Sequence, residues 1–182
     1  IVVIEGAFHG RTMGALSATG SAAIQEAFKP LLPGFIRIGR NDIEALENIA
    51  KNQRDVVAVH LEPIQGESGI WPLNTDFLKR ARTLCDEHNW LPSFDEVQPG
   101  NGRCGALYVF QRLGVTPDVL ATAKGLGNGL PIGACMTNER ASELLIAGDH
   151  GTTYGGNPIC CAAASAVINT LSAEQLWDQA DI

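Results

Sequence analysis

Short apolar runs alternate with stretches of helical periodicity along this chain, and this alternation limits the possible folds most strongly. Runs rich in β-branched residues predict buried strands at 1–4, 35–38, 56–61, 91–94, 119–122 and 132–136. Because helical segments lie between several of them, the pattern predicts an α/β fold with a largely parallel sheet flanked by helices. In such sheets ligands bind beyond the carboxyl ends of the strands.

Three helices are predicted from their starts and their apolar faces. Asn41 is the expected N-cap of the first, with Glu44 completing a capping box. The second begins near Thr75, and the third follows the N-cap Asn157 and runs to about Leu171. The residues expected to face inward in the first two helices are Ile43, Leu46, Ile49, Ala50, Phe77, Leu78, Ala81, Leu84 and Cys85.

Composition and charge exclude several classes of function. The 13 basic and 20 acidic residues give a formal net charge of -7, and no basic run could neutralise a nucleic-acid backbone. No apolar run approaches the roughly 20 residues that span a bilayer, so the protein is expected in the cytoplasm, away from membranes. The five cysteines show no pair with two-residue spacing, so no metal site is predicted.

The sequence begins inside an apolar run, at 1–4, and stops without a cap or turn signal. We therefore expect residues 1–182 to be an excised segment, truncated at both ends.

Lys124 lies between the predicted strand 119–122 and the glycine-rich run 125–129. Such a strand would deliver the amine to a loop of little bulk, where a flat ligand could approach the backbone. A partly desolvated amine is a better nucleophile, as covalent chemistry with carbonyl compounds requires. The alternative is a surface lysine at a strand end. The remaining lysines lie in polar or helical surroundings: Lys29, Lys51 and Lys79.

Asp95 directly follows the predicted strand 91–94. A carboxylate at the end of a buried strand is costly unless a positive group compensates it. A protonated pyridine nitrogen would serve, while an arginine partner or a helix N-cap is the alternative.

Two glycine-punctuated loops offer further binding groups. The loop 6–12 carries Phe8 for ring stacking and Arg11 for carboxylate recognition, while His9 is expected to have a structural role. The loop 148–158 combines small residues and hydroxyls with a helix N-terminus, which suits a phosphate, although a plain capping turn is the alternative.

Residues 100–105 satisfy the glycine pattern of dinucleotide-binding oxidoreductases, and Asp118 follows at the distance of a ribose-binding acid. However, the residues 95–99 separate the strand from the first glycine, whereas in such proteins the glycine turn leaves the strand directly. This is the least favoured of the functions considered.

Five motifs occur in the order found in class III aminotransferases, at 8–11, 62–67, 95–98, 123–125 and 152–158. The chain resembles this family, and within it most resembles the acetylornithine and ornithine aminotransferases. The interval of 29 positions between Asp95 and Lys124 also agrees.

The resemblance implies a fold type I large domain that binds pyridoxal 5'-phosphate. Lys124 resembles the lysine that holds the cofactor as a Schiff base and moves the substrate Cα proton, and Asp95 resembles the acid that keeps the pyridine nitrogen protonated. The other cofactor ligands implied are Phe8 and Val97 on the ring faces, Gln98 at the phenolic oxygen and Thr153 at the phosphate. In the family this threonine comes from the partner subunit, so a homodimer is implied.

On the substrate side, Arg11 resembles the residue that grips a carboxylate, and Glu62 the acid near the substrate side chain. The implied reaction moves an amino group from N-acetylornithine, or a related ornithine derivative, to 2-oxoglutarate, in arginine biosynthesis. Residues 1–182 would be a partial cofactor-binding domain, with an N-terminal part and a C-terminal small domain lying outside it.

The sequence also departs from the family, since the strand before Asp95 is usually apolar throughout but here contains Pro92 and Ser93, with Pro99 shortly after. The alternatives are another class III enzyme, such as a 4-aminobutyrate or ornithine aminotransferase, an aminomutase, or a non-catalytic segment.

Overall fold

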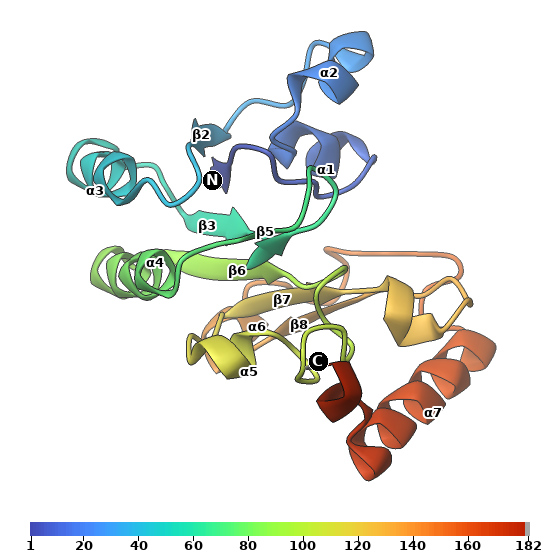
Figure 1. Cartoon of the computed structure of the whole chain (residues 1–182). Helices are drawn as coiled ribbons and strands as arrows, with labels where there is room; N and C mark the ends of the chain where they lie inside the picture. The colour runs from blue at the N-terminus through green and yellow to red at the C-terminus, as the bar shows by residue number, and fades with distance from the viewer. Residues whose placement is uncertain (181–182) are drawn as a thin grey trace. The chain divides into compact units, whose positions relative to one another are not determined.

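The structure is a computed structural model that describes residues 1–180 (Figure 1). The chain forms two compact units, Ile1–Asp95 and a second that begins at Glu96. Among the described residues, no helix is both long and apolar enough to cross a membrane.

The first unit is built on four parallel strands in the order β2 (Ile36–Ile38), β1 (Val2–Ile4), β3 (Ala58–Leu61) and β6 (Leu91–Asp95). All four strands were predicted, with small shifts at their ends. The prediction of a largely parallel sheet is therefore confirmed, and the carboxyl ends of its strands carry the loops that begin at Glu5, Glu62 and Glu96.

Two amphipathic helices accompany this sheet, α3 (Ile43–Asn52) and α4 (Thr75–His88). Helix α4 packs on β3 and β6, and α3 packs on α4 (Figure 1). The inward residues predicted for α4 are all buried, and those of α3 are buried except for the half-buried Ile43. Helical periodicity thus identified both helices and their buried faces.

The predicted N-cap of α3 was wrong by one residue. Asp42 is the cap, and its carboxylate accepts from the backbone N–H of Ala45 at 2.9 Å. Asn41 instead adopts a left-handed backbone with φ of 60°, which asparagine tolerates better than most residues. Its side chain accepts from the backbone N–H of Asn74, the N-cap of α4, at 2.7 Å.

Several short elements of the first unit were not predicted: α1 (Met13–Ala18), α2 (Ala22–Gln25), the 3-10 helix η1 (Glu26–Phe28) and a hairpin of β4 (Ile64–Gln65) with β5 (Trp71–Pro72). The Gln25 side chain donates to the carbonyls of Leu16 and Thr19, which ties α2 to the end of α1. Neither helix has a side-chain cap hydrogen bond, so tertiary contacts take the place of local signals.

The second unit contains the antiparallel pair β7 (Val119–Thr122) and β8 (Ala134–Thr137), both predicted as strands. Its helical segments are α5 (Phe110–Leu113), η2 (Lys124–Gly127), α6 (Glu139–Ser142), α7 (Pro158–Glu174) and η3 (Leu176–Ala180). Helix α7 packs against η2, and Asn157 caps it by accepting from the backbone N–H of Cys160. The prediction of this helix and of its cap is confirmed.

Candidate functional site

A buried pair of polar side chains lies at the carboxyl end of the first unit's sheet. Asp95 ends β6 and is only 6% exposed. Its Oδ2 atom lies 2.9 Å from Nδ1 of His9, so Nδ1 carries the hydrogen that faces the carboxylate. The backbone N–H of His9 donates to the Thr19 hydroxyl at 3.0 Å, which fixes the loop after β1. His9, for which the sequence indicated only a structural role, is therefore a direct partner of Asp95.

A second histidine, which the sequence analysis passed over, packs on the first. The ring of His60 in β3 lies 4.1 Å from that of His9 between centroids, at an angle of 42°. Its Nδ1 atom lies 2.9 Å from the hydroxyl of Ser93 in β6. Burial, and to a lesser extent the nearby His9, lower the pKa of His60 to about 4, against the opposing effects of Asp95 and Ser93. His60 is therefore neutral at pH 7.

Glu62, at the carboxyl end of β3, is 3% exposed and points back into the same unit. Its Oε2 atom accepts from the backbone N–H of Phe8 at 2.8 Å. Burial raises the pKa of Glu62 to about 7, although hydrogen bonds from the backbone of Phe8 and Gly66 oppose the shift. This carboxyl group can therefore change its protonation state near neutral pH.

We expect Glu62→Gln to stabilise the chain more at pH 8 than at pH 5. The pKa of Glu62 is raised in the folded chain, so the unfolded chain loses this proton first. The contribution of Glu62 to the free energy of unfolding therefore falls as pH rises from about 4.5 to about 7. Glutamine also accepts from the backbone N–H of Phe8 but does not ionise. The increase in the free energy of unfolding that it causes should therefore be larger at pH 8 than at pH 5, by on the order of 2 kcal/mol. Urea unfolding at both pH values measures it. The exposed Glu67→Gln is the control, and an equal gain for Glu62→Gln at pH 5 and pH 8 would contradict the expectation.

Phe8 and Arg11, predicted from one loop, do come together. The Arg11 guanidinium carbon lies 5.8 Å from the centroid of the Phe8 ring, and the two side chains line a small cavity of about 120 Å³. Arg11 is exposed and Phe8 is half-buried. An aromatic face and a cation at one opening suit a flat anionic ligand.

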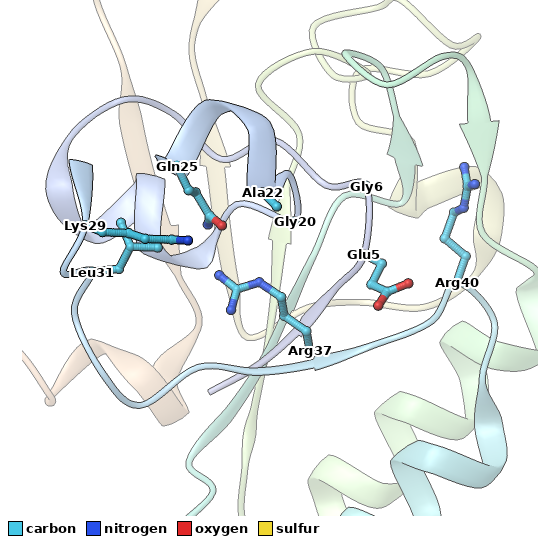
Figure 2. A pocket seen from close by; sticks show the side chains of 9 residues that line it. All are labelled: Glu5, Gly6, Gly20, Ala22, Gln25, Lys29, Leu31, Arg37 and Arg40. Atoms are coloured by element: carbon cyan, nitrogen blue, oxygen red, sulfur yellow. The ribbon is translucent and has the colours of Figure 1, made fainter. Parts of the chain in front are cut away.

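A larger cavity of about 850 Å³ in the first unit has Lys29, Arg37 and Arg40 among its lining residues, with Glu5 as the acid (Figure 2). Two of these three cationic side chains already have partners within the protein. Arg37 donates to the carbonyls of Ser17 and Thr19, and Lys29 pairs with Glu26 at 2.6 Å. None of the residues predicted to bind cofactor or substrate is among those lining this cavity.

Lys124 begins η2 in the second unit with a φ of 47°, an unusual left-handed backbone for a residue with a side chain. The turn is fixed from one side by Asn101, whose amide donates to the Thr122 hydroxyl at 2.9 Å and to the Ala123 carbonyl at 3.0 Å. A side chain at Gly125 would come within 3.2 Å of Asn101. The predicted delivery of Lys124 by a strand to a tight glycine turn is present, whereas its side chain is exposed and not partly desolvated as expected.

The dinucleotide-binding alternative is wrong for residues 100–105. These residues form turns, and the helix that follows begins only at Phe110. The carboxylate of the fully buried Glu96 accepts from the backbone N–H groups of Val109 and Phe110, at 2.6 and 2.8 Å. The helix N-terminus that a pyrophosphate would need is thus occupied by an acidic side chain.

The predicted site residues fall in both units. The first unit carries Phe8, Arg11, Glu62 and Asp95, and the second carries Val97, Gln98, Lys124 and Thr153. Val97 and Gln98 are half-buried directly after Asp95, and Thr153 is exposed in the turn before α7. Sequence reasoning missed His60, Ser93 and Asn101. Two of these had a visible signal, because His60 and Ser93 interrupt apolar strands, each two residues before an acid.

Comparison with known proteins supplies a family. The model of the aminotransferase class-III family matches residues 1–182. An acetylornithine aminotransferase from Nitrosomonas europaea is 45% identical over 180 residues, which cover 99% of this chain and 46% of that protein. One from Clostridium acetobutylicum is 48% identical over 171 residues, 94% of this chain and 44% of that protein. The chain thus spans less than half the length of these curated relatives.

Solved structures agree with this similarity. The crystal structure of the ornithine aminotransferase from Toxoplasma gondii ME49 superposes with a TM-score of 0.92 at 37% identity, over 98% of this chain and 42% of that one. A PLP-bound amine transaminase from an uncultivated Pseudomonas species superposes with a TM-score of 0.90 at 31% identity, over 97% of this chain and 46% of that one.

Proposed function

This chain belongs to the aminotransferase class-III family, and on that premise we propose that the whole protein is a pyridoxal-phosphate-dependent aminotransferase. The observation that carries the proposal is the buried Asp95 carboxylate at the end of β6, held by the ring N–H of His9. Such a group is suited to keeping a proton on the ring nitrogen of a bound pyridine, which is the task that the resemblance assigns to it.

The residues present fit the cofactor in each unit. In the first, Asp95 would hold the ring nitrogen and Phe8 would lie on one ring face. In the second, Lys124 would hold the aldehyde carbon covalently, with Val97 on the other ring face, Gln98 at the phenolic oxygen and Thr153 at the phosphate. The left-handed Lys124 turn and its support by Asn101 are a backbone arrangement of the kind found at functional sites.

When bound, pyridoxal phosphate supplies an electron sink for the bond that breaks at the substrate Cα. Lys124 then has two tasks of its own. Its amine would hold the cofactor covalently and, when free, would carry the proton that leaves the substrate Cα. Arg11 would grip a substrate carboxylate, as its exposed guanidinium beside the Phe8 ring allows. Glu62 would lie near the substrate side chain.

We propose N-acetylornithine or a related ornithine derivative as amino donor and 2-oxoglutarate as acceptor, in arginine biosynthesis and in the cytoplasm. The support is the identity of 45% and 48% to relatives named acetylornithine aminotransferase. A homodimer that donates Thr153 across its interface belongs to the same proposal. It agrees with the exposed position of Thr153 in the turn before α7.

A full-length protein carrying this sequence should use N-acetylornithine with a higher kcat/KM than 4-aminobutyrate. The ratio of kcat/KM values measures discrimination between substrates, and steady-state kinetics with 2-oxoglutarate as acceptor provides it. Arg11→Lys should lower the kcat/KM for N-acetylornithine, because an ammonium cannot bind a carboxylate in the bidentate manner of a guanidinium. A preference for 4-aminobutyrate would remove the substrate assignment and leave the cofactor assignment intact.

A further inference from the structure

We propose that His60 and Ser93 are positioning residues that hold the His9 ring against Asp95. The contacts among these four residues do not depend on the function of the protein. Only their consequence for an aminotransferase rests on the proposed function. Neither residue belongs to the motifs that identified the family. Both lie in the first unit, together with the pair on which they act.

The strand register places Ser93 beside His60 and on the same face of the sheet as Asp95. His60 in β3 pairs with Ser93 in β6, so their side chains lie on the same face of the sheet and can form the 2.9 Å hydrogen bond. Side chains two positions apart on a strand share a face, so Ser93 and Asp95 do as well. The two polar residues that interrupt the apolar strands β3 and β6 therefore belong to a single group of side chains.

His9 needs this support because hydrogen bonding holds its ring from one side only. Nδ1 bonds to Asp95, but Nε2 is buried without a hydrogen-bond partner among the described residues. A ring held at one nitrogen can still tilt about that bond. The His60 ring lies 4.1 Å away between centroids, inclined by 42°, and we infer that this contact blocks the tilt. The bond from His60 to Ser93 fixes this support in turn.

The His60 ring must also be uncharged, so that the Asp95 carboxylate remains available to a ligand. A protonated His60 would compete for the carboxylate that the proposed function assigns to a ring nitrogen. The lowered pKa of His60 agrees with a neutral ring. Ser93 satisfies one nitrogen of that ring without adding charge, which accounts for a serine in a strand expected to be apolar throughout.

The test follows the Nδ1 hydrogen of His9 in a full-length protein carrying this sequence, labelled with 15N-histidine and without cofactor. We expect this hydrogen to exchange slowly with water in the wild type and about tenfold or more faster in His60→Ala, because the ring loses its support. His60→Phe keeps a ring face against His9 and should restore most of the protection. His88, which stacks on Trp90, provides the control His88→Ala, with unchanged exchange expected.

Exchange that stays slow in a folded His60→Ala variant would overturn the proposal. If His60→Ala unfolds, the Ser93→Ala variant is measured instead. Faster exchange of the His9 hydrogen in Ser93→Ala supports the proposal, and unchanged exchange overturns it. His9, His60 and Asp95 also offer ligand atoms within 4.8 Å of one another. A His9 hydrogen that becomes visible only after a chelator is added would show a metal site instead and would also overturn the proposal.

These outcomes are independent of those for the proposed function. A protein that fails to bind pyridoxal phosphate at Lys124 can still show His60-dependent exchange at His9. Conversely, a working aminotransferase with unchanged exchange in His60→Ala would lose only the inference about His60 and Ser93.

Discussion

Pyridoxal phosphate bound to a full-length protein carrying this sequence, and then fixed by borohydride, should be found on Lys124. The other lysines of the segment, Lys29, Lys51 and Lys79, should remain unmodified. All four side chains are exposed, so exposure does not select among them. The difference is the backbone, because among these four lysines only Lys124 has a left-handed conformation, in a turn after β7 that Asn101 supports. Peptide mass spectrometry after reduction identifies the labelled residue.

The matching variant is Lys124→Asn, because asparagine tolerates the φ of 47° at this position better than alanine does. We expect it to lose the covalent label and about 10³-fold or more of the activity, since anchor and proton carrier are lost together. Lys51→Asn, at the exposed end of α3, should change neither. A label on Lys29, Lys51 or Lys79 with Lys124 unmodified would overturn the assignment.

Asp95→Asn should lower the single-turnover rate by about 10²- to 10³-fold while the cofactor still binds. The amide retains an oxygen that can accept from His9 Nδ1, so the local geometry survives. It has no negative charge to hold a proton on the ring nitrogen, and the electron sink is weakened. Absorbance of the bound cofactor and single-turnover kinetics, measured on the same preparation, separate binding from chemistry.

The control for Asp95→Asn is Asp76→Asn on the exposed first turn of α4, which removes the same charge away from the site. It should leave the rate unchanged. If Asp95→Asn reacted as fast as the wild type, Asp95 would have to be a structural residue whose role is to order His9.

The parts of the fold that could be predicted are those with a local signal. Strand 1–4 is apolar throughout, strand 119–122 is apolar except for Thr122, and α4 shows its buried face through helical spacing. Helices α1 and α2 are short and lack side-chain caps. They depend on hydrogen bonds from Gln25 to carbonyls of α1 and the residue after it, which sequence spacing does not reveal.

The same division applies to the site. Lys124 and Asp95 each follow a recognisable strand, so their positions at strand ends could be predicted from neighbouring residues alone. The partner of Asp95 comes from 86 positions away in the chain, and the His60–Ser93 bond depends on the register of two strands. Asn101 was considered only within the glycine pattern of the least favoured, dinucleotide-binding alternative, and its role in fixing a neighbouring strand end depends on a contact that spans 22 positions.

The His60–Ser93 register also constrains how this sequence could have evolved. Starting from two apolar residues, a histidine introduced alone at position 60 would leave a buried ring nitrogen unsatisfied, at a cost of about 1–3 kcal/mol. A serine introduced first at position 93 is smaller, and its hydroxyl can bond to nearby backbone meanwhile. The accessible mutational order is therefore serine before histidine, and afterwards Ser93 cannot revert alone without leaving the ring nitrogen of His60 unsatisfied.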